Sequence, residues 1–290
     1  MPRARWIPLT MLALTACASH AGAADAGMPA VDAPVVVPVS RYLDAIPSVE
    51  VMVDGNPHRF LFDTAGGITV GTPALADSIE CAPWGRITGH RMRGDRIDGQ
   101  RCDEVEMQVS GVPLQLESML VWDLSKLLPP NAPPLAGSMG LDAWQGRAIT
   151  LDLGNGELVV ETPASLALRV KDAVEVPVRF GREIQGLALV PFVAVETPKG
   201  RLWMELDTGS TGKLIVGSHT ADVLGLDPAI KDGQATTITL AGGIEVQAKA
   251  KVEDLIIDGN IGAPMLRQWA VTIDLANERL WIAPRVQRKD

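Results

Sequence analysis

One stretch of sequence occurs twice in this chain, and the repeat constrains the fold more than any other feature. Residues 47–66 and 191–210 each begin with proline, run on as alternating apolar residues, turn, and continue through a second run to an Asp-Thr pair. The interval from proline to aspartate is the same in both copies, since 63 − 47 = 16 and 207 − 191 = 16. Two such runs around a short turn are typical of a β-hairpin. Each copy therefore predicts a hairpin that ends at an aspartate.

The correspondence between the copies continues on both sides of the hairpin. The further matched segments are 37–39 with 176–178, 68–71 with 214–217, 139–142 with 261–264, and 148–160 with 270–282. Agreement in the same order at this many points is hard to obtain by chance, and it indicates two diverged copies of one unit. The strand patterns predict a mostly β fold, with a few short helices such as 73–79 and 219–224.

The copies differ mainly in the middle. The interval from the aspartate to the later glycine is 140 − 63 = 77 residues in the first copy and 262 − 207 = 55 in the second. About 22 extra residues therefore lie in the first copy, within 84–135, and they predict a hairpin excursion and a long loop. The boundary between the copies falls near 161–175, which gives an N-terminal lobe at 35–165 and a C-terminal lobe at 166–290.

Composition excludes some function classes. A chain of 290 residues can bury a substantial core, and its 28 glycines and 21 prolines favour turns and short strands over long helices. A formal net charge of −9 argues against nucleic acid as a partner. The four histidines are scattered and no Cys/His group has metal-ligand spacing, so we expect no metal and no cofactor.

The first residues are typical of an export signal. Arg3 and Arg5 precede a short apolar run that ends Leu-Thr-Ala-Cys at residues 14–17, which resembles a bacterial lipobox. This predicts a signal peptide at 1–16, a lipidated Cys17 and a flexible tether at 17–34. The alternative is an ordinary secretory signal cleaved near residues 21–24.

A lipid anchor on Cys17 would place the protein in the cell envelope, facing the periplasm, with the membrane as a partner through the anchor only. By resemblance to Gram-negative lipoproteins, Ala18 in place of aspartate favours the outer membrane. Removal of residues 1–16 takes away two arginines, so the mature charge is 24 − 35 = −11.

Two cysteines remain in the mature chain, Cys81 and Cys102, in a compartment that permits disulfides. A bridge between them would close a loop of 21 residues and stabilise the fold by about 3 kcal/mol in the chain-entropy model. The alternative is two separate buried thiols.

The two Asp-Thr motifs resemble those of retropepsin-like and pepsin-like aspartic proteases. The motifs are Phe-Asp-Thr-Ala-Gly at 62–66 and Leu-Asp-Thr-Gly-Ser at 206–210, and the later apolar-apolar-Gly element of that family has its nearest matches at 138–140 and 260–262. The resemblance covers most of residues 35–290. It implies two tandem acid-protease β-barrel lobes in one chain, so that a monomer suffices for catalysis.

The resemblance also implies roles for the motif residues. Asp63 and Asp207 would share one proton, because two close carboxyl groups cannot easily both ionise. One would activate a water as general base while the other acts as general acid. The supporting residues would be Thr64, Thr208, Gly66, Gly209 and Ser210. The two threonines would bind the neighbouring backbone across a pseudo-two-fold axis, and the glycines would permit tight turns.

The sequence departs from the family pattern at Ala65, where the family has glycine. A mobile aromatic hairpin over the substrate is also not evident; Trp84 and Trp122 are only candidates for it, and Trp122 is interpreted as a packing residue. Asp152 and Asp274 precede turns and are interpreted as turn residues. Asp142 is interpreted as a structural residue and His219 as a surface residue.

Three functions remain open at this point. The first is an aspartic endopeptidase of the cell envelope that hydrolyses an extended peptide lying across both lobes. The second is a catalytically inactive lipoprotein that kept the groove, binds peptides or envelope partners, and lost turnover through Ala65. The third is a structural envelope component that uses its lobes as an interaction surface.

Overall fold

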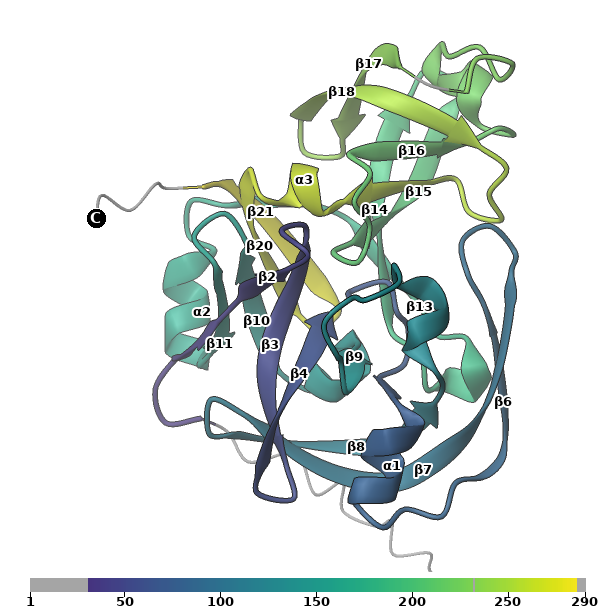
Figure 1. Cartoon of the computed structure of the whole chain (residues 1–290). Coiled ribbons are helices and arrows are strands. Elements are labelled where there is room, and N and C mark those ends of the chain that lie inside the picture. Colours follow the sequence, from purple (N-terminus) through teal and green to yellow (C-terminus); the bar gives the residue numbers. More distant parts are fainter. Residues whose placement is uncertain (1–30, 232, 286–290) are drawn as a thin grey trace, which may run out of the picture.

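The computed structural model describes residues 31–231 and 233–285. The predicted signal peptide at 1–16, the lipidation site Cys17 and most of the tether at 17–34 lie outside the described residues. Within the described part, strands dominate and form three sheets, which Figure 1 shows as two stacked lobes joined by a shared layer. No helix among the described residues is long and apolar enough to cross a membrane.

The N-terminal lobe is an eight-stranded sheet built around the first hairpin. Its strands, in spatial order, are β2 (Ser40–Tyr42), β3 (Ile46–Val53), β4 (Asn56–Phe62), β9 (Gly137–Met139), β5 (Val70–Gly71), β8 (Val112–Val121), β7 (Arg96–Val109) and β6 (Trp84–His90). The turn between β3 and β4 is formed by Asp54 and Gly55, with φ of 47° and 73°. Positive φ at both positions is the requirement of a two-residue type I′ turn, which explains the Asp-Gly pair there.

The C-terminal lobe repeats this arrangement in a seven-stranded sheet. Its strands, in spatial order, are β13 (Val178–Gly181), β14 (Val190–Thr197), β15 (Gly200–Asp207), β19 (Gly259–Gly262), β16 (Leu214–Gly217), β18 (Ile244–Glu253) and β17 (Gln234–Leu240). The β15 strand pairs in parallel with β19, as β4 does with β9. The same local topology in both lobes confirms the prediction of a mostly β chain made of two β-barrel lobes.

A third, six-stranded sheet joins the lobes. It consists of β1 (Val35–Pro38), β11 (Glu157–Glu161), β10 (Ala148–Asp152), β20 (Trp269–Asp274), β21 (Arg279–Pro284) and β12 (Val174–Glu175). Its two central strands, β10 and β20, come from different copies, and Thr150 and Thr272 share a buried hydrogen bond of 2.9 Å between their hydroxyl groups. The first copy supplies three adjacent strands of this sheet and the second copy supplies the other three, so the lobes join along β10 and β20. The division of the chain at residues 165 and 166 stays a prediction.

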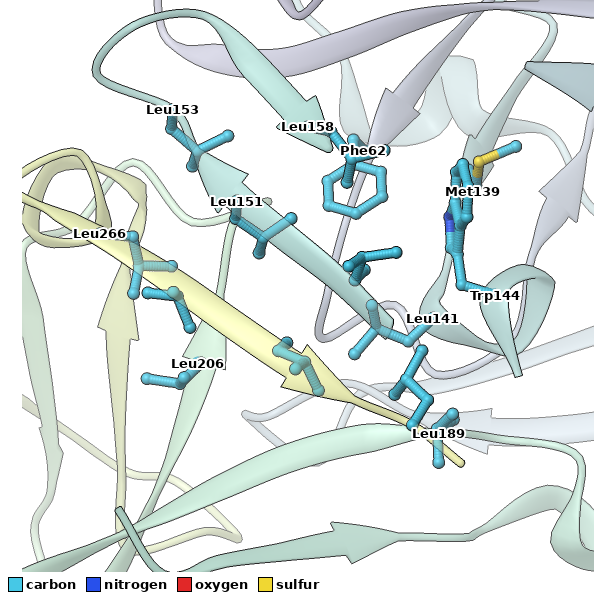
Figure 2. Close-up of a cluster of buried hydrophobic side chains, with 14 of the residues drawn as sticks. Phe62, Met139, Leu141, Trp144, Leu151, Leu153, Leu158, Leu189, Leu206 and Leu266 are labelled. Carbon is cyan, nitrogen blue, oxygen red and sulfur yellow. The ribbon is translucent and has the colours of Figure 1, made fainter. Parts of the chain in front are cut away.

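One hydrophobic core runs through both lobes. Figure 2 shows Phe62 and Trp144 of the first copy and Leu206 and Leu266 of the second within a single cluster of buried side chains. The lobes therefore share apolar surface instead of packing as two independent cores, which fixes the two aspartate loops relative to each other.

Short helices connect the strands. They are α1 (Pro73–Ser78), α2 (Pro163–Arg169) and α3 (Ala263–Leu266), with 3₁₀ turns η1 (Leu124–Leu127), η2 (Leu141–Trp144), η3 (Ile184–Gly186) and η4 (Ala221–Leu224). The predicted helix at 73–79 is α1, capped by the Thr72 hydroxyl and started by Pro73. The segment predicted as a helix at 219–224 forms only the 3₁₀ turn η4, which ends at Gly225 with a φ of 71°.

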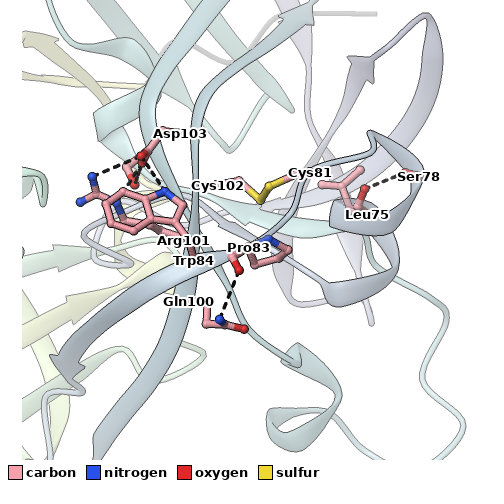
Figure 3. The surroundings of a disulfide bond; sticks show 10 residues. Leu75, Ser78, Cys81, Pro83, Trp84, Gln100, Arg101, Cys102 and Asp103 are labelled. Atoms are coloured by element: carbon pink, nitrogen blue, oxygen red, sulfur yellow. Dashed lines mark hydrogen bonds and ion pairs between the residues drawn. A yellow bond between two sulfur atoms is a disulfide. The ribbon is translucent and has the colours of Figure 1, made fainter.

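The extra residues of the first copy form a long hairpin. Strand β6 forms the edge of the sheet and pairs with the first part of β7, and the C-terminal lobe begins its corresponding strand β17 without such an excursion. Cys81 and Cys102 form a disulfide at the base of this hairpin. Beside it, the Trp84 ring stacks under Arg101, with 4.4 Å from the guanidinium carbon to the ring centroid, and donates to Asp103 (Figure 3).

Candidate active site

The two motif aspartates lie together where the lobes meet. Asp63 directly follows β4, and Asp207 is the last residue of β15. The two carboxyl groups are in hydrogen-bond contact with each other. Asp63 also accepts the N–H of Ala65 at 3.0 Å through Oδ1. The Asp207 side chain receives backbone hydrogen bonds from Gly209 and Ser210.

Burial raises the pKa of both groups, and for Asp63 the charge of Asp207 adds to it. The pKa of Asp63 rises to about 7, first because its carboxyl group is desolvated and then because of the charge of Asp207. Desolvation is also the main cause that raises the pKa of Asp207, against hydrogen bonds from Asn260 and from the backbone that lower it. Raised pKa values at both carboxyl groups are expected of a pair that shares one proton at neutral and weakly acidic pH.

Two threonines lock the aspartate loops to each other. The Thr64 hydroxyl donates to the Leu206 carbonyl oxygen at 2.6 Å, and the Thr208 hydroxyl donates to the Phe62 carbonyl oxygen at 2.6 Å. In return, the Thr208 hydroxyl accepts the N–H of Thr64 at 3.0 Å, and the Thr64 hydroxyl accepts the N–H of Thr208 at 3.1 Å. Both threonines are buried. Four reciprocal bonds across the lobe junction hold the two aspartate loops against each other.

The small residues of the motifs fill the turns after each aspartate. A Cβ on Gly209 would lie 2.6 Å from the carboxyl carbon of Asp63, so no other residue fits there without displacing the acid. The N–H of Gly66 bonds the Asp63 carbonyl oxygen at 3.3 Å, and Ser210 accepts the N–H of Gly212 at 3.3 Å. Ala65, the counterpart of Gly209, is half-buried in its turn.

A third buried carboxyl group was missed by sequence reasoning. The Asn260 side-chain amide donates to Asp207 Oδ2 at 2.7 Å and to Glu205 Oε2 at 2.9 Å. Burial is the main cause that raises the pKa of Glu205 well above its usual range, and the charge of Asp207 adds to it. Glu205 lies in an alternating strand pattern, where it resembles an ordinary exposed residue, and only its two-residue spacing from Asp207 indicated a shared face.

The other acidic residues that sequence analysis weighed have structural contacts. Asp142 accepts from the N–H and the hydroxyl of Thr69 at 2.9 and 2.7 Å, which ties η2 to the loop after Asp63. Burial raises the pKa of Asp142 to about 6. Asp152 and Asp274 each accept hydrogen bonds inside the turn that follows them. No group of three or more His, Cys, Asp or Glu side chains in residues 31–231 and 233–285 could hold a metal ion.

The long hairpin reaches from the N-terminal lobe to the C-terminal lobe. Its tip contacts the end of β18 and the loop after it: Arg93 pairs with Glu253 at 2.6 Å, and Met92 O accepts the N–H of Ile256 at 2.9 Å. Figure 1 shows β6 rising along the edge of the molecule toward that loop.

Neither tryptophan named as a candidate lies at this tip. Trp84 is at the base of the hairpin beside the disulfide, and Trp122 packs on a small apolar cluster around Ile68, Ile87 and Leu120. The tip, residues 91–95, has no aromatic residue. Trp122 is therefore a packing residue, and Trp84 belongs to the hairpin but not to its tip.

The architecture has a counterpart among solved structures. The crystal structure of basic 7S globulin from soybean superposes with a TM-score of 0.58 at 11% sequence identity, covering 87% of this chain and 95% of the globulin chain. No protein-family description matches the sequence, and no curated protein matches it. The structural likeness shows the fold, which is the pepsin-like arrangement of two β-barrel lobes in one chain.

Proposed function

We propose that this protein is an aspartic endopeptidase, which hydrolyses peptide bonds with a water molecule activated by Asp63 and Asp207. The observation that carries the proposal is the reciprocal bonding of Thr64 and Thr208, which holds the two carboxyl groups in contact at the lobe junction. Two adjacent carboxyl groups repel each other and destabilise the fold. An arrangement that nevertheless holds them together therefore favours a catalytic role over a structural one.

The chemistry follows from one proton shared by two acids. The ionised carboxylate takes a proton from water as the water attacks the peptide carbonyl carbon, while the protonated carboxyl group donates to the carbonyl oxygen. Proton transfer to the nitrogen then releases the amine. Because the pKa of Asp63 is raised to about 7, the single-proton form persists up to near-neutral pH, and activity falls above that pH.

The substrate of this reaction is an extended peptide or an unfolded segment that lies across both lobes. We further propose a monomer, attached through Cys17 to the membrane of the cell envelope and facing the periplasm, with the outer membrane favoured. Nucleic acid is no partner, given the acidic balance of the chain.

The test is cleavage of a mixed peptide library by the purified full chain from pH 3 to pH 8. We expect cleavage that is lost in Asp207→Asn. The matched control is Asp54→Asn, because Asn-Gly suits the type I′ turn that Asp54 occupies.

A folded protein that cleaves nothing at any pH, while it still binds peptides, would contradict this proposal. It would favour the alternative of an inactive peptide-binding lipoprotein. The observation behind that alternative is Ala65, which stands where the second copy has Gly209. If Ala65 blocks turnover, Ala65→Gly should restore it.

A further inference from the structure

Glu205 and Asp207 lie on the same face of β15. The side chains on either side of Glu205 in the strand, Met204 and Leu206, belong to the hydrophobic core. Since side chains alternate along a strand, residues 205 and 207 lie on the opposite face, where the catalytic pair lies. The single Asn260 amide that bonds both carboxyl groups confirms that they are neighbours.

The first copy has an apolar residue at the equivalent position. Leu61 stands two residues before Asp63, as Glu205 stands two residues before Asp207. Leu61 is paired in register with Ser138, whereas Glu205 is paired in register with Asn260. Leu61 is outside both hydrophobic clusters although its neighbours in β4 belong to the core. The two halves of the site are thus related by the repeat, and one carries an apolar side chain where the other carries an acid.

A second acidic residue lies close to Glu205. Glu183, in the loop between β13 and β14, is exposed, and its negative charge contributes to the raised pKa of Glu205. Neither glutamate forms an ion pair with a lysine or arginine in the described part of the chain. The nearby Arg179 stacks on Trp203 instead, 4.4 Å from the ring centroid.

The only hydrogen bond to the Glu205 carboxyl group within residues 31–231 and 233–285 comes from Asn260, and it engages Oε2. The other oxygen, Oε1, has capacity to accept from a ligand. A group that donates hydrogen bonds and carries positive charge would complete this site, because it would offset the repulsion among three neighbouring acids.

We propose that Glu205, with Glu183 at the rim, selects substrates that place a lysine or arginine side chain on the Asp207 side of the scissile bond. The Asp63 side, lined by Leu61, takes an apolar residue. This inference rests on the proposed peptidase function and names its substrate class: peptides with an apolar residue on one side of the cleaved bond and a basic residue on the other.

The test compares four peptides that differ only in the two residues flanking the cleaved bond. The pairs are Leu-Lys, Lys-Leu, Leu-Leu and Leu-Glu, assayed with the full chain at pH 6. We expect kcat/KM for one of the two lysine-containing orders to exceed that for Leu-Leu by roughly 10- to 100-fold, the range of a charge-assisted hydrogen bond. The Leu-Glu peptide should be the poorest.

Two variants and one control assign the effect to Glu205. Glu205→Leu, which copies the first half of the site, should reverse the preference in favour of Leu-Leu, and Glu205→Gln should reduce the preference for lysine by about tenfold or more. Glu106→Gln, an exposed glutamate on β7, should change nothing. If Glu205→Leu does not fold, Glu205→Gln decides. Equal rates for Leu-Leu and both lysine peptides, unchanged in the folded variants, would overturn the inference.

A binding assay separates this inference from the proposed function. Analogues of the same four peptides, in which an uncharged hydroxyethylene group replaces the scissile peptide bond, bind without being cleaved. Tighter binding of one lysine analogue, lost in Glu205→Leu, would support the acidic subsite even in a protein that cleaves nothing, and only the peptidase proposal would then fail. If the protein cleaves peptides but shows no preference for lysine over leucine in either kcat/KM or binding affinity, the acidic subsite is overturned and the peptidase proposal stands.

Discussion

Gly209 approaches Asp63 so closely that a Cβ at position 209 would lie 2.6 Å from the carboxyl carbon of the acid. Gly209→Ala therefore displaces Asp63, and an error of about 1 Å in a catalytic group costs roughly 100-fold in rate. We expect kcat/KM to fall by about that factor while the protein stays folded. The measurement is peptide cleavage by the two proteins at one pH.

The repeat supplies the matched comparison for this substitution. Ala65→Gly, at the equivalent position of the first copy, removes a methyl group and should leave kcat/KM unchanged or higher. Similar losses in Gly209→Ala and Ala65→Gly would show that the close approach at Gly209 is not what limits the site.

The reciprocal hydrogen bonds of Thr64 and Thr208 across the lobes should be important for stability. Thr64→Val and Thr208→Val each keep the side-chain volume and leave buried backbone groups without partners, which costs about 1–3 kcal/mol per unsatisfied group. We expect each variant to lower the free energy of unfolding by at least that amount, measured by urea denaturation. The double variant should lose less free energy of unfolding than the two single variants together, because the two hydroxyl groups bond the same junction.

Thr237→Val, an exposed position on β17, is the control and should stay within about 0.5 kcal/mol of the wild type. Additive losses in the double variant would indicate two independent contacts and would contradict the reciprocal arrangement.

The raised pKa of Asp63 makes stability depend on pH. The pKa is about 7 in the folded protein against an ordinary value of 3.8, so the folded state binds this proton more tightly. The stabilisation is fully present below about pH 4 and is lost as pH rises toward pH 7, with a slope of up to about 1.4 kcal/mol per pH unit for one proton. The free energy of unfolding should fall across this window, and Asp63→Asn should flatten the fall.

Asp54→Asn again serves as the control, because it removes an exposed turn carboxylate and should leave the slope unchanged. A wild-type stability that rises steadily from pH 4 to pH 7, with the same slope in Asp63→Asn, would argue against a protonated pair.

The hairpin tip should be held by its contact with the C-terminal lobe. Arg93→Ala removes the ion pair with Glu253, which for partly exposed groups contributes about 0.2–1 kcal/mol. We therefore expect amide exchange at Ile256, whose N–H bonds Met92, to accelerate up to about fivefold. Arg86→Ala, which breaks an ion pair to Asp98 inside the hairpin, should not change exchange at Ile256. Identical protection in both variants would mean that the tip is held by other contacts.

The sequence predicted those features that depend on local residue patterns and occur in both copies. Asp63 and Asp207 were found because each ends a matched hairpin, and the threonines follow them directly. The two mostly β copies followed from the ordered repeat, which needs no knowledge of long-range contacts, and the double-barrel fold was implied by the resemblance to aspartic proteases.

Features that depend on pairing between distant segments were not predictable in this way. Glu205 and Asn260 are 55 residues apart and meet only because β15 pairs in parallel with β19. The ion pair between Arg93 at the hairpin tip and Glu253 forms only because one lobe packs on the other. Alternation along a strand shows which residues share a face, but not which strand lies beside it.

The proposed catalytic pair is tested most directly by comparing Asp63→Asn, Asp207→Asn and the double variant with the wild type on one cleaved peptide. Residues that act as a unit lose their effect together. We predict that each single substitution lowers kcat/KM by at least about 1,000-fold and that the double variant loses little more. Cleavage that persists in the folded double variant would contradict the account, because it would place the chemistry outside Asp63 and Asp207.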